Sequence, residues 1–200
     1  HGAGTNMPVV FPIGPEDRDR LEMLAGRWLT KIHDSRLSLW WYETMERYVY
    51  LEEDLAEDSS EAPDWKFFTC NGKVEIFQVD VGRFGDHVQT IYSRSGRFID
   101  KEMYFKSGSP VGIPTNFSDM IDVAEGIGRS FDFIRVDMFV KGTDIYLGEI
   151  GLVPNGASIR IISPELDWKL GAAWKAPWMG KVDSQFSAGH YNKKDMTGLD

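Results

Sequence analysis

The chain has 200 residues, of which 42% are hydrophobic and 26% charged, a composition typical of a globular protein with a sizeable core. Its net charge is −9 and it has no run of basic residues, which argues against nucleic acid or an acidic membrane surface as a partner. No apolar stretch approaches the roughly 20 residues of a membrane span. Cys70 is the only cysteine, which excludes an internal disulfide and fits a reducing, cytoplasmic location.

The first segment with a chemical signature is HGAGTN, over residues 1–6. Small residues with free N–H groups can cradle phosphate oxygens, although a frayed terminus has the same composition. Pro15 and the acids after it predict the start of a helix. The spacing of four apolar residues along that helix predicts a stripe that faces a core: Leu21, Leu24, Ala25 and Trp28.

A second helix is predicted over 37–47, followed by a buried strand over 48–51 and a polar loop over 56–63. The strongest local signal comes next, because Asn71-Gly72 between Asp64–Cys70 and Lys73–Val81 predicts a β-hairpin. Alternation along the first of these strands places Lys66 on one face with Phe68 and Cys70.

The chain then predicts a short strand over 90–92, a loop over 101–114 and a helix from about 116 to 127. A short strand over 158–162, a short helix over 167–174 and a polar tail over 185–200 follow the central segment. No repeat or linker divides the chain, so we expect a single domain over 1–200.

The central segment, residues 131–156, predicts two strands joined by a tight turn. Arg135 and Asp137 are two apart on the first strand and therefore share a face. A three-residue turn, Gly142-Thr143-Asp144, would pair Lys141 with Ile145 and Asp137 with Glu149. A two-residue turn would put the two acids on opposite faces and remove this argument.

Two interpretations of this acid pair remain open. Carboxylates roughly 4.5–5.5 Å apart at Cβ repel each other unless a cation lies between them. Mg²⁺ is one such cation, since it binds one or two carboxylates together with phosphate oxygens and water. Alternatively, Arg135 pairs with one acid in an ordinary half-buried salt bridge.

Taken in order, several segments resemble the TupA-like (teichuronopeptide biosynthesis) branch of the ATP-grasp superfamily. HGAGTN resembles the phosphate loop, residues 28–55 the helix and hinge strand before the adenine pocket, and DWKFFTCNGK over 64–73 the strand-turn-strand that follows. RVDMFV and YLGEIGLVPNG within 135–156 resemble the metal-binding end of the fold, and LDWKLG over 166–171 its tail.

The resemblance implies an α+β fold: an ATP-grasp-like antiparallel sheet with flanking helices on one side and a nucleotide cleft. It divides the chain into a glycine-rich loop with helices over 1–50, a nucleotide- and metal-binding sheet over 51–184 and a tail over 185–200. The family's lysine strand and N-terminal substrate region would lie upstream of His1, so the N-terminal part of the fold is expected to be missing.

The resemblance also implies site residues, with ATP and Mg²⁺ as cofactors. Arg135 matches the arginine that contacts phosphate. Apart from the resemblance, Arg83 is a candidate for holding the acceptor carboxylate, because a guanidinium group can bind a carboxylate through two hydrogen bonds; the alternative is an ordinary surface arginine. Asp137 and Glu149 match the metal ligands. Gly151 replaces the asparagine of the family's Glu-x-Asn motif, so Asn155 or water molecules would substitute for that ligand. The implied nucleotide-binding residues are Gly2, Ala3, Gly4, Thr5, Asn6, Glu52, Glu53, Leu55, Asp64 and Lys66.

The implied function is a carboxylate–amine ligase that acts through an acylphosphate on small-molecule carboxylate and amine substrates. The branch's name suggests a uronic-acid cell-surface polymer as one of them. The alternative is a catalytically inactive relative that serves as a carbohydrate-binding or scaffold protein, with seven Trp and seven Tyr available for stacking on sugars. Mg²⁺-dependent nucleotide binding would separate the two.

Overall fold

The structure, a computed structural model, describes residues 14–30, 44–50, 52–53, 55, 62–82 and 85–175. The chain forms two compact units, His1–Asp54 with Asn155–Ser158, and Leu55–Pro154 with Ile159–Asp200. Whether they make up one domain stays a prediction. The predicted phosphate loop over 1–6, Arg83 and the tail over 185–200 lie outside the described residues.

In the first unit, a 3-10 turn, Pro15–Asp17, leads into helix α1, Arg18–Thr30, which confirms the predicted helix start. Asp17 accepts a hydrogen bond from the backbone N–H of Gly14 at 3.2 Å and so caps the turn. The predicted apolar stripe does not reach a core, because α1 has no buried residue.

The buried strand predicted over 48–51 is wrong for the part that can be assessed. Residues 48–50 form no strand, and the side chains of Tyr48 and Tyr50 are largely exposed. The predicted helix over 37–47 lies mostly outside the described residues, and 45–47 are not helical. Aromatic and β-branched residues gave this stretch its strand signal, but nothing in the described part of the unit covers them.

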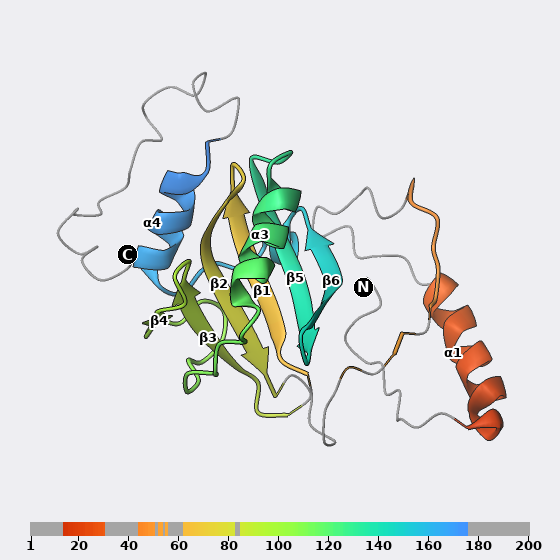
Figure 1. Ribbon diagram of the computed structural model, residues 1–200. Helices are drawn as coiled ribbons and strands as arrows, with labels where there is room; N and C mark the ends of the chain where they lie inside the picture. The colour runs from red at the N-terminus through yellow and green to blue at the C-terminus, as the bar shows by residue number, and fades with distance from the viewer. Residues whose placement is uncertain are drawn as a thin grey trace. The chain divides into compact units, whose positions relative to one another are not determined.

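The second unit is built on a six-stranded antiparallel sheet in the order β4-β3-β2-β1-β5-β6 (Figure 1). Its strands are β1 (Asp64–Cys70), β2 (Lys73–Val81), β3 (Val88–Ser93), β4 (Phe98–Ile99), β5 (Phe133–Lys141) and β6 (Asp144–Gly151). The predicted hairpin is confirmed: Asn71 and Gly72 both have positive φ, 49° and 79°, the requirement of the tight turn that Asn-Gly favours. The strand predicted over 158–162 does not form.

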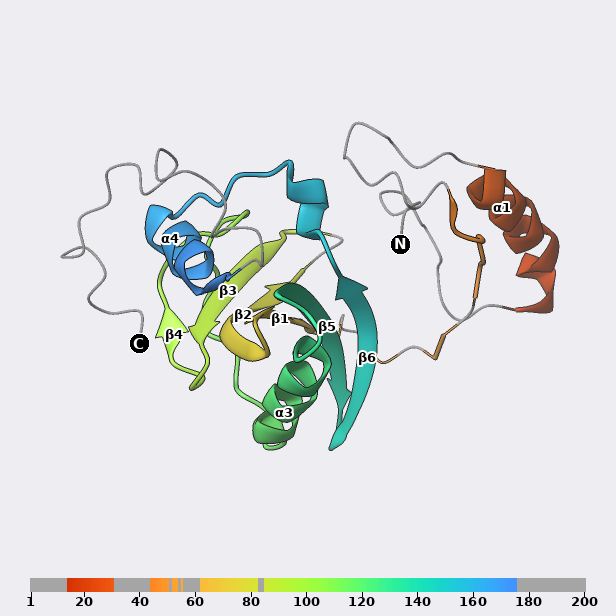
Figure 2. The same cartoon turned by 90° about the horizontal axis from the view of Figure 1, so that it is seen from above.

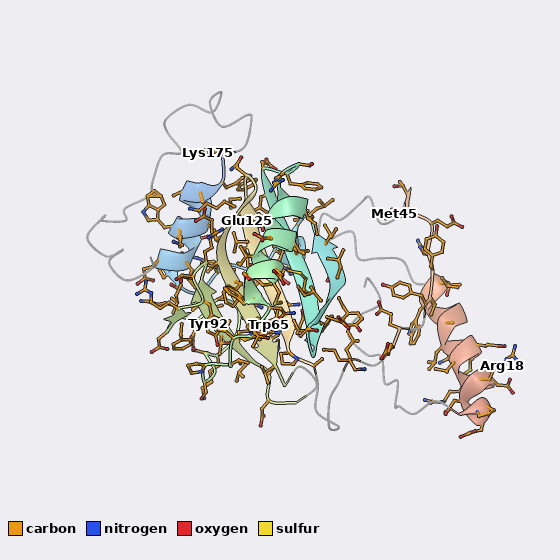
Figure 3. All side chains as sticks on the ribbon, in the orientation of Figure 1. Arg18, Met45, Trp65, Tyr92, Glu125 and Lys175 are labelled. Carbon is orange, nitrogen blue, oxygen red and sulfur yellow. The ribbon has the colours of Figure 1, made fainter. Side chains whose placement is uncertain are left out.

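Helices α3 (Phe117–Gly128) and α4 (Pro164–Ala173) cover opposite faces of the sheet (Figure 2). On the α3 face, Trp65, Phe67 and Tyr92 pack with Met120 and other side chains of α3 (Figure 3 labels Trp65 and Tyr92). On the α4 face, alternate residues of the same strands pack against Leu166 and Leu170. The expectation of an α+β antiparallel sheet is confirmed, and the expectation that its helices lie on one side is wrong.

The start of α4 yields a prediction about acid stability. Ser163 Oγ accepts a hydrogen bond from the N–H of Leu166 at 3.3 Å, and Glu165 accepts hydrogen bonds from Ser163 Oγ at 2.7 Å and Lys101 Nζ at 2.8 Å. These bonds, that of Lys101 first, lower the pKa of Glu165 to about 2. A lowered pKa stabilises the folded state above the ordinary value of 4.5, and that contribution is lost as the pH falls toward 2.

Glu165→Gln is therefore expected to unfold at lower urea concentration than the wild type at pH 7, with a difference that shrinks steadily below pH 4.5. Because Glu165 is solvent-accessible, the effect is small. The exposed Glu102→Gln serves as the control. A difference between Glu165→Gln and wild type that does not change with pH would contradict this role for the carboxylate.

Candidate functional site

The sheet face that carries α4 changes from apolar to polar along its strands. On β1, Phe68 and Cys70 lie in the core under α4, whereas Lys66 and Asp64, two and four residues further along the same face, are charged and buried. On β5, Phe133 packs against the α4 core, and Arg135 and Asp137 follow on the same face. Strand alternation thus gathers the charged groups at one end of one face.

Lys66 lies at the centre of this charged end. Its Nζ donates hydrogen bonds to Asp64 and, at 3.0 Å, to Asp137, and it lies 3.8 Å from a carboxylate oxygen of Asp80. All four side chains are buried. Burial raises the pKa of Asp64 above its usual value; the charge of Lys66 opposes this rise and the charge of Asp137 adds to it.

Arg135 joins the two predicted metal ligands. Its Nε and Nη2 each donate to Asp137 at 2.7 Å, a two-pronged contact, and Nη2 also reaches Glu149 at 3.4 Å. Burial by itself would lower the pKa of Arg135, but Asp137 and Glu149 outweigh it and raise the pKa. The side chain of Asp137 is 3% exposed and that of Glu149 25%, so this pair opens toward solvent at β6.

Asp137 lies opposite Glu149, as predicted, but the turn does not have the predicted length. Lys141 pairs with Asp144 across a two-residue turn, Gly142-Thr143, and not with Ile145. In regular strands that turn would place Gly148 opposite Asp137. A bulge between Met138 and Asp137 makes Gly148 the extra residue and brings Glu149 onto the face of Asp137.

We refer to Asp64, Lys66, Asp80, Arg135, Asp137 and Glu149 as the charged cluster. It has four carboxylates and two cationic side chains, so with all of them ionised it carries two excess negative charges. Hard carboxylate oxygens and excess negative charge fit Mg²⁺. Among the described residues no group of three or more His, Cys, Asp or Glu side chains could hold a metal ion. The donor set therefore fits an ion bound by Asp137 and Glu149 together with phosphate oxygens and water.

Comparison with protein families decides which class of protein this is. The family model described as TupA-like ATPgrasp matches residues 29–175, more than half of the chain. The chain belongs to the TupA-like ATP-grasp family. No curated protein and no solved structure matches it.

The predicted site of this TupA-like ATP-grasp chain is only partly described. The structure brings together Asp64, Lys66, Arg135, Asp137 and Glu149. The candidate ligand Asn155, with φ 53°, and the candidate nucleotide residues Glu52 and Glu53 belong to the first unit, whereas Leu55 begins the second. Their roles stay predictions. The phosphate-loop residues Gly2, Ala3, Gly4, Thr5 and Asn6 and the candidate Arg83 lie outside the described residues.

The sequence analysis missed a second side of the charged cluster, on β2. Asp80 lies opposite Asp64, and Gln78 lies opposite Lys66. His87 adds its Nε2 at 3.4 Å from Asp80 Oδ1, without the geometry of a hydrogen bond. The available signal was the polar alternation of Gln78 and Asp80 in a strand whose other residues are mostly apolar.

Proposed function

We propose that this TupA-like ATP-grasp protein is an ATP- and Mg²⁺-dependent carboxylate–amine ligase. The observation that carries the proposal is the charged cluster, in which Asp137 and Glu149 lie opposite each other on adjacent strands and Arg135 contacts both of them. Family membership supports the ligase class. None of the described helices has the length and apolar character needed to span a bilayer. A cytoplasmic location, where ATP is available, is part of the proposal.

The chemistry has two steps. A carboxylate oxygen attacks the γ-phosphorus of ATP, the bond from that phosphorus to the bridging oxygen breaks, and ADP leaves an acylphosphate behind. An amine then attacks the acyl carbon, a C–N bond forms, the C–O bond to phosphate breaks, and phosphate leaves as the nitrogen gives up its proton. Phosphoryl transfer needs positioning and neutralisation of charge more than covalent help from the protein.

The described residues can supply that positioning. Asp137 and Glu149 would hold Mg²⁺, which neutralises phosphate charge when bound. Arg135, an obligate cation with several N–H donors, would turn from the acids toward phosphate oxygens. Lys66 would contribute a second cation from β1, and Asp64 would accept a hydrogen bond from the ribose. Arg83 remains the candidate for the acceptor carboxylate, and a uronic-acid polymer remains a candidate substrate.

A second function is favoured by one feature of the same site. Arg135 donates two hydrogen bonds of 2.7 Å to Asp137, an arrangement that neutralises the acid without a metal ion. Exposed Tyr48 and Tyr50 offer faces for stacking on sugars. The alternative function is therefore that of a catalytically inactive ATP-grasp relative, which binds carbohydrate or acts as a scaffold. In such a protein Arg135 would stay bound to Asp137.

Ligand-induced stabilisation separates the two functions. At 100-fold excess over their dissociation constant, ATP and Mg²⁺ together should stabilise the wild type by about 2.7 kcal/mol, and neither alone should do so. Glu149→Gln removes one charged ligand at the more exposed end of the cluster and should abolish the joint effect. Asp122→Asn, an exposed change on α3, is the control and should respond like the wild type. If ATP and Mg²⁺ together do not stabilise the wild type, the ligase proposal is wrong.

A further inference from the structure

The β2 side of the charged cluster contains a buried hydrogen-bond acceptor without a partner. Gln78 Nε2 donates to Asp80 Oδ1 at 2.7 Å, which fixes the orientation of the amide and turns Oε1 away from Asp80. The residue is only 2% exposed, and Oε1 has no hydrogen-bond partner among the described residues. A buried acceptor left in this state carries a desolvation cost that a bound donor would remove.

Asp80, which accepts the hydrogen bond from the Gln78 amide nitrogen, can also accept further hydrogen bonds. A carboxylate has about four lone-pair sites. Gln78 occupies one of them, Lys66 Nζ is 3.8 Å away from Oδ2, and His87 Nε2 does not form a hydrogen bond at its 3.4 Å distance. The cluster as a whole has two more carboxylates than cations. The β2 side therefore offers negative charge and hydrogen-bond acceptors that are not fully used.

We propose that Gln78 and Asp80 bind the ammonium group of the amine substrate. An ammonium group brings one positive charge and N–H donors, and these satisfy Gln78 Oε1 and the free sites of Asp80. The proposal rests on the ligase function above and names the group by which its second substrate is recognised.

The position of these residues suits the second step of that reaction. Strands β2 and β5 flank β1, and the carboxylates of Asp80 and Asp137 lie 3.8 Å and 3.0 Å from the same Lys66 Nζ. Lys66 lies between them and contacts Asp137 directly. The ammonium group held at β2 would thus lie beside a carboxylate activated at β5 and β6, and it would become a nucleophile on giving one proton to the Asp80 carboxylate. His87, whose side chain is 19% exposed, marks the more solvent-accessible edge of this side.

The test compares primary amines with a cation that cannot donate. Thermal stability and calorimetric binding are measured with methylammonium, ethanolamine and L-alanine, in the presence of Mg²⁺ and a non-hydrolysable β,γ-imido analogue of ATP. Tetramethylammonium chloride at the same ionic strength has the charge but no N–H group. The variants are Gln78→Met, which keeps the length of the side chain, and Asp80→Asn, with Thr90→Val as a control at a buried polar site on the opposite face.

At least one primary amine should bind the wild type and Thr90→Val more tightly than tetramethylammonium. Gln78→Met and Asp80→Asn should each weaken that binding about tenfold or more, and Gln78→Met, which leaves every member of the charged cluster in place, should keep nucleotide binding within about threefold of wild type. If either variant does not fold, the other carries the test. The proposal is wrong if primary amines bind no better than tetramethylammonium, or if their binding survives both substitutions.

The nucleotide titration on the wild type keeps this result apart from the test of the ligase function. Nucleotide binding without amine binding overturns the ammonium site alone and leaves an ordinary buried water as the partner of Gln78. If neither nucleotide nor amine binds, the ligase function is wrong, and the ammonium site is wrong with it.

Discussion

Asp137→Asn is expected to lower the free energy of unfolding by about 3–5 kcal/mol, the range seen when one partner of a buried ion pair is removed. Asp137 accepts hydrogen bonds from Arg135 at 2.7 Å and from Lys66 at 3.0 Å, and its side chain is 3% exposed. An amide of the same shape removes the negative charge and turns two N–H donors toward these two buried cations.

Urea unfolding of wild type, Asp137→Asn and the exposed control Asp122→Asn measures this loss. The control should fall within about 0.5 kcal/mol of wild type, as surface substitutions usually do. A loss below about 1 kcal/mol in Asp137→Asn would mean that the pair behaves as a solvated surface salt bridge. The variant should also lose the joint response to ATP and Mg²⁺, because the carboxylate proposed as metal ligand is gone.

Lys66→Met is expected to destabilise the protein by a similar amount, about 3–5 kcal/mol, for the opposite electrostatic reason. The substitution leaves Asp64, Asp80 and Asp137 around an apolar side chain, and it raises the excess of the charged cluster from two negative charges to three. The loss should shrink as the pH is lowered, since the pKa of Asp64 is already raised by burial and protonation removes the repulsion.

The same variant reports on the affinity of the cluster for cations. Added Mg²⁺ should stabilise Lys66→Met more than it stabilises wild type, because a divalent ion can replace the lost ammonium. Lys106→Met, at an exposed lysine, should match wild type in its stability and in its response to Mg²⁺. If Lys66→Met were as stable as wild type at neutral pH and indifferent to Mg²⁺, the carboxylates would have to carry protons, and the cluster would not be a cation site.

Local chemistry explains which elements the sequence predicted. Asn71-Gly72 supplied two residues suited to positive φ, so the β1–β2 hairpin was predicted with its observed bounds. Arg135 and Asp137 were predicted to share a face with Glu149, and they do. Predictions that needed a partner elsewhere in the chain failed: the stripe of α1 and residues 48–50 have the composition of buried elements, but the described residues do not bury them.

The residue opposite Lys66 on β2 could not be predicted from the local sequence pattern. Counting back from the Asn71-Gly72 turn in a regular hairpin would put Phe77 opposite Lys66. A bulge between Phe68 and Thr69 shifts the register by one residue and places Gln78 there. No residue in this part of the sequence indicates the bulge. The contribution of β2 to the site therefore emerged only from the three-dimensional register.

The bulge at Gly148 has a consequence for how relatives of this protein are aligned. A side chain at 148 would bring its Cβ within 2.7 Å of the Phe139 ring, so replacing this residue strains the strand. Deleting it removes only the extra residue of the bulge, and regular pairing from Met138 and Leu147 then still sets the glutamate opposite Asp137. A one-residue gap at this point in an alignment is therefore compatible with an intact acid pair, and the interval between aspartate and glutamate is a poor criterion for recognising the site.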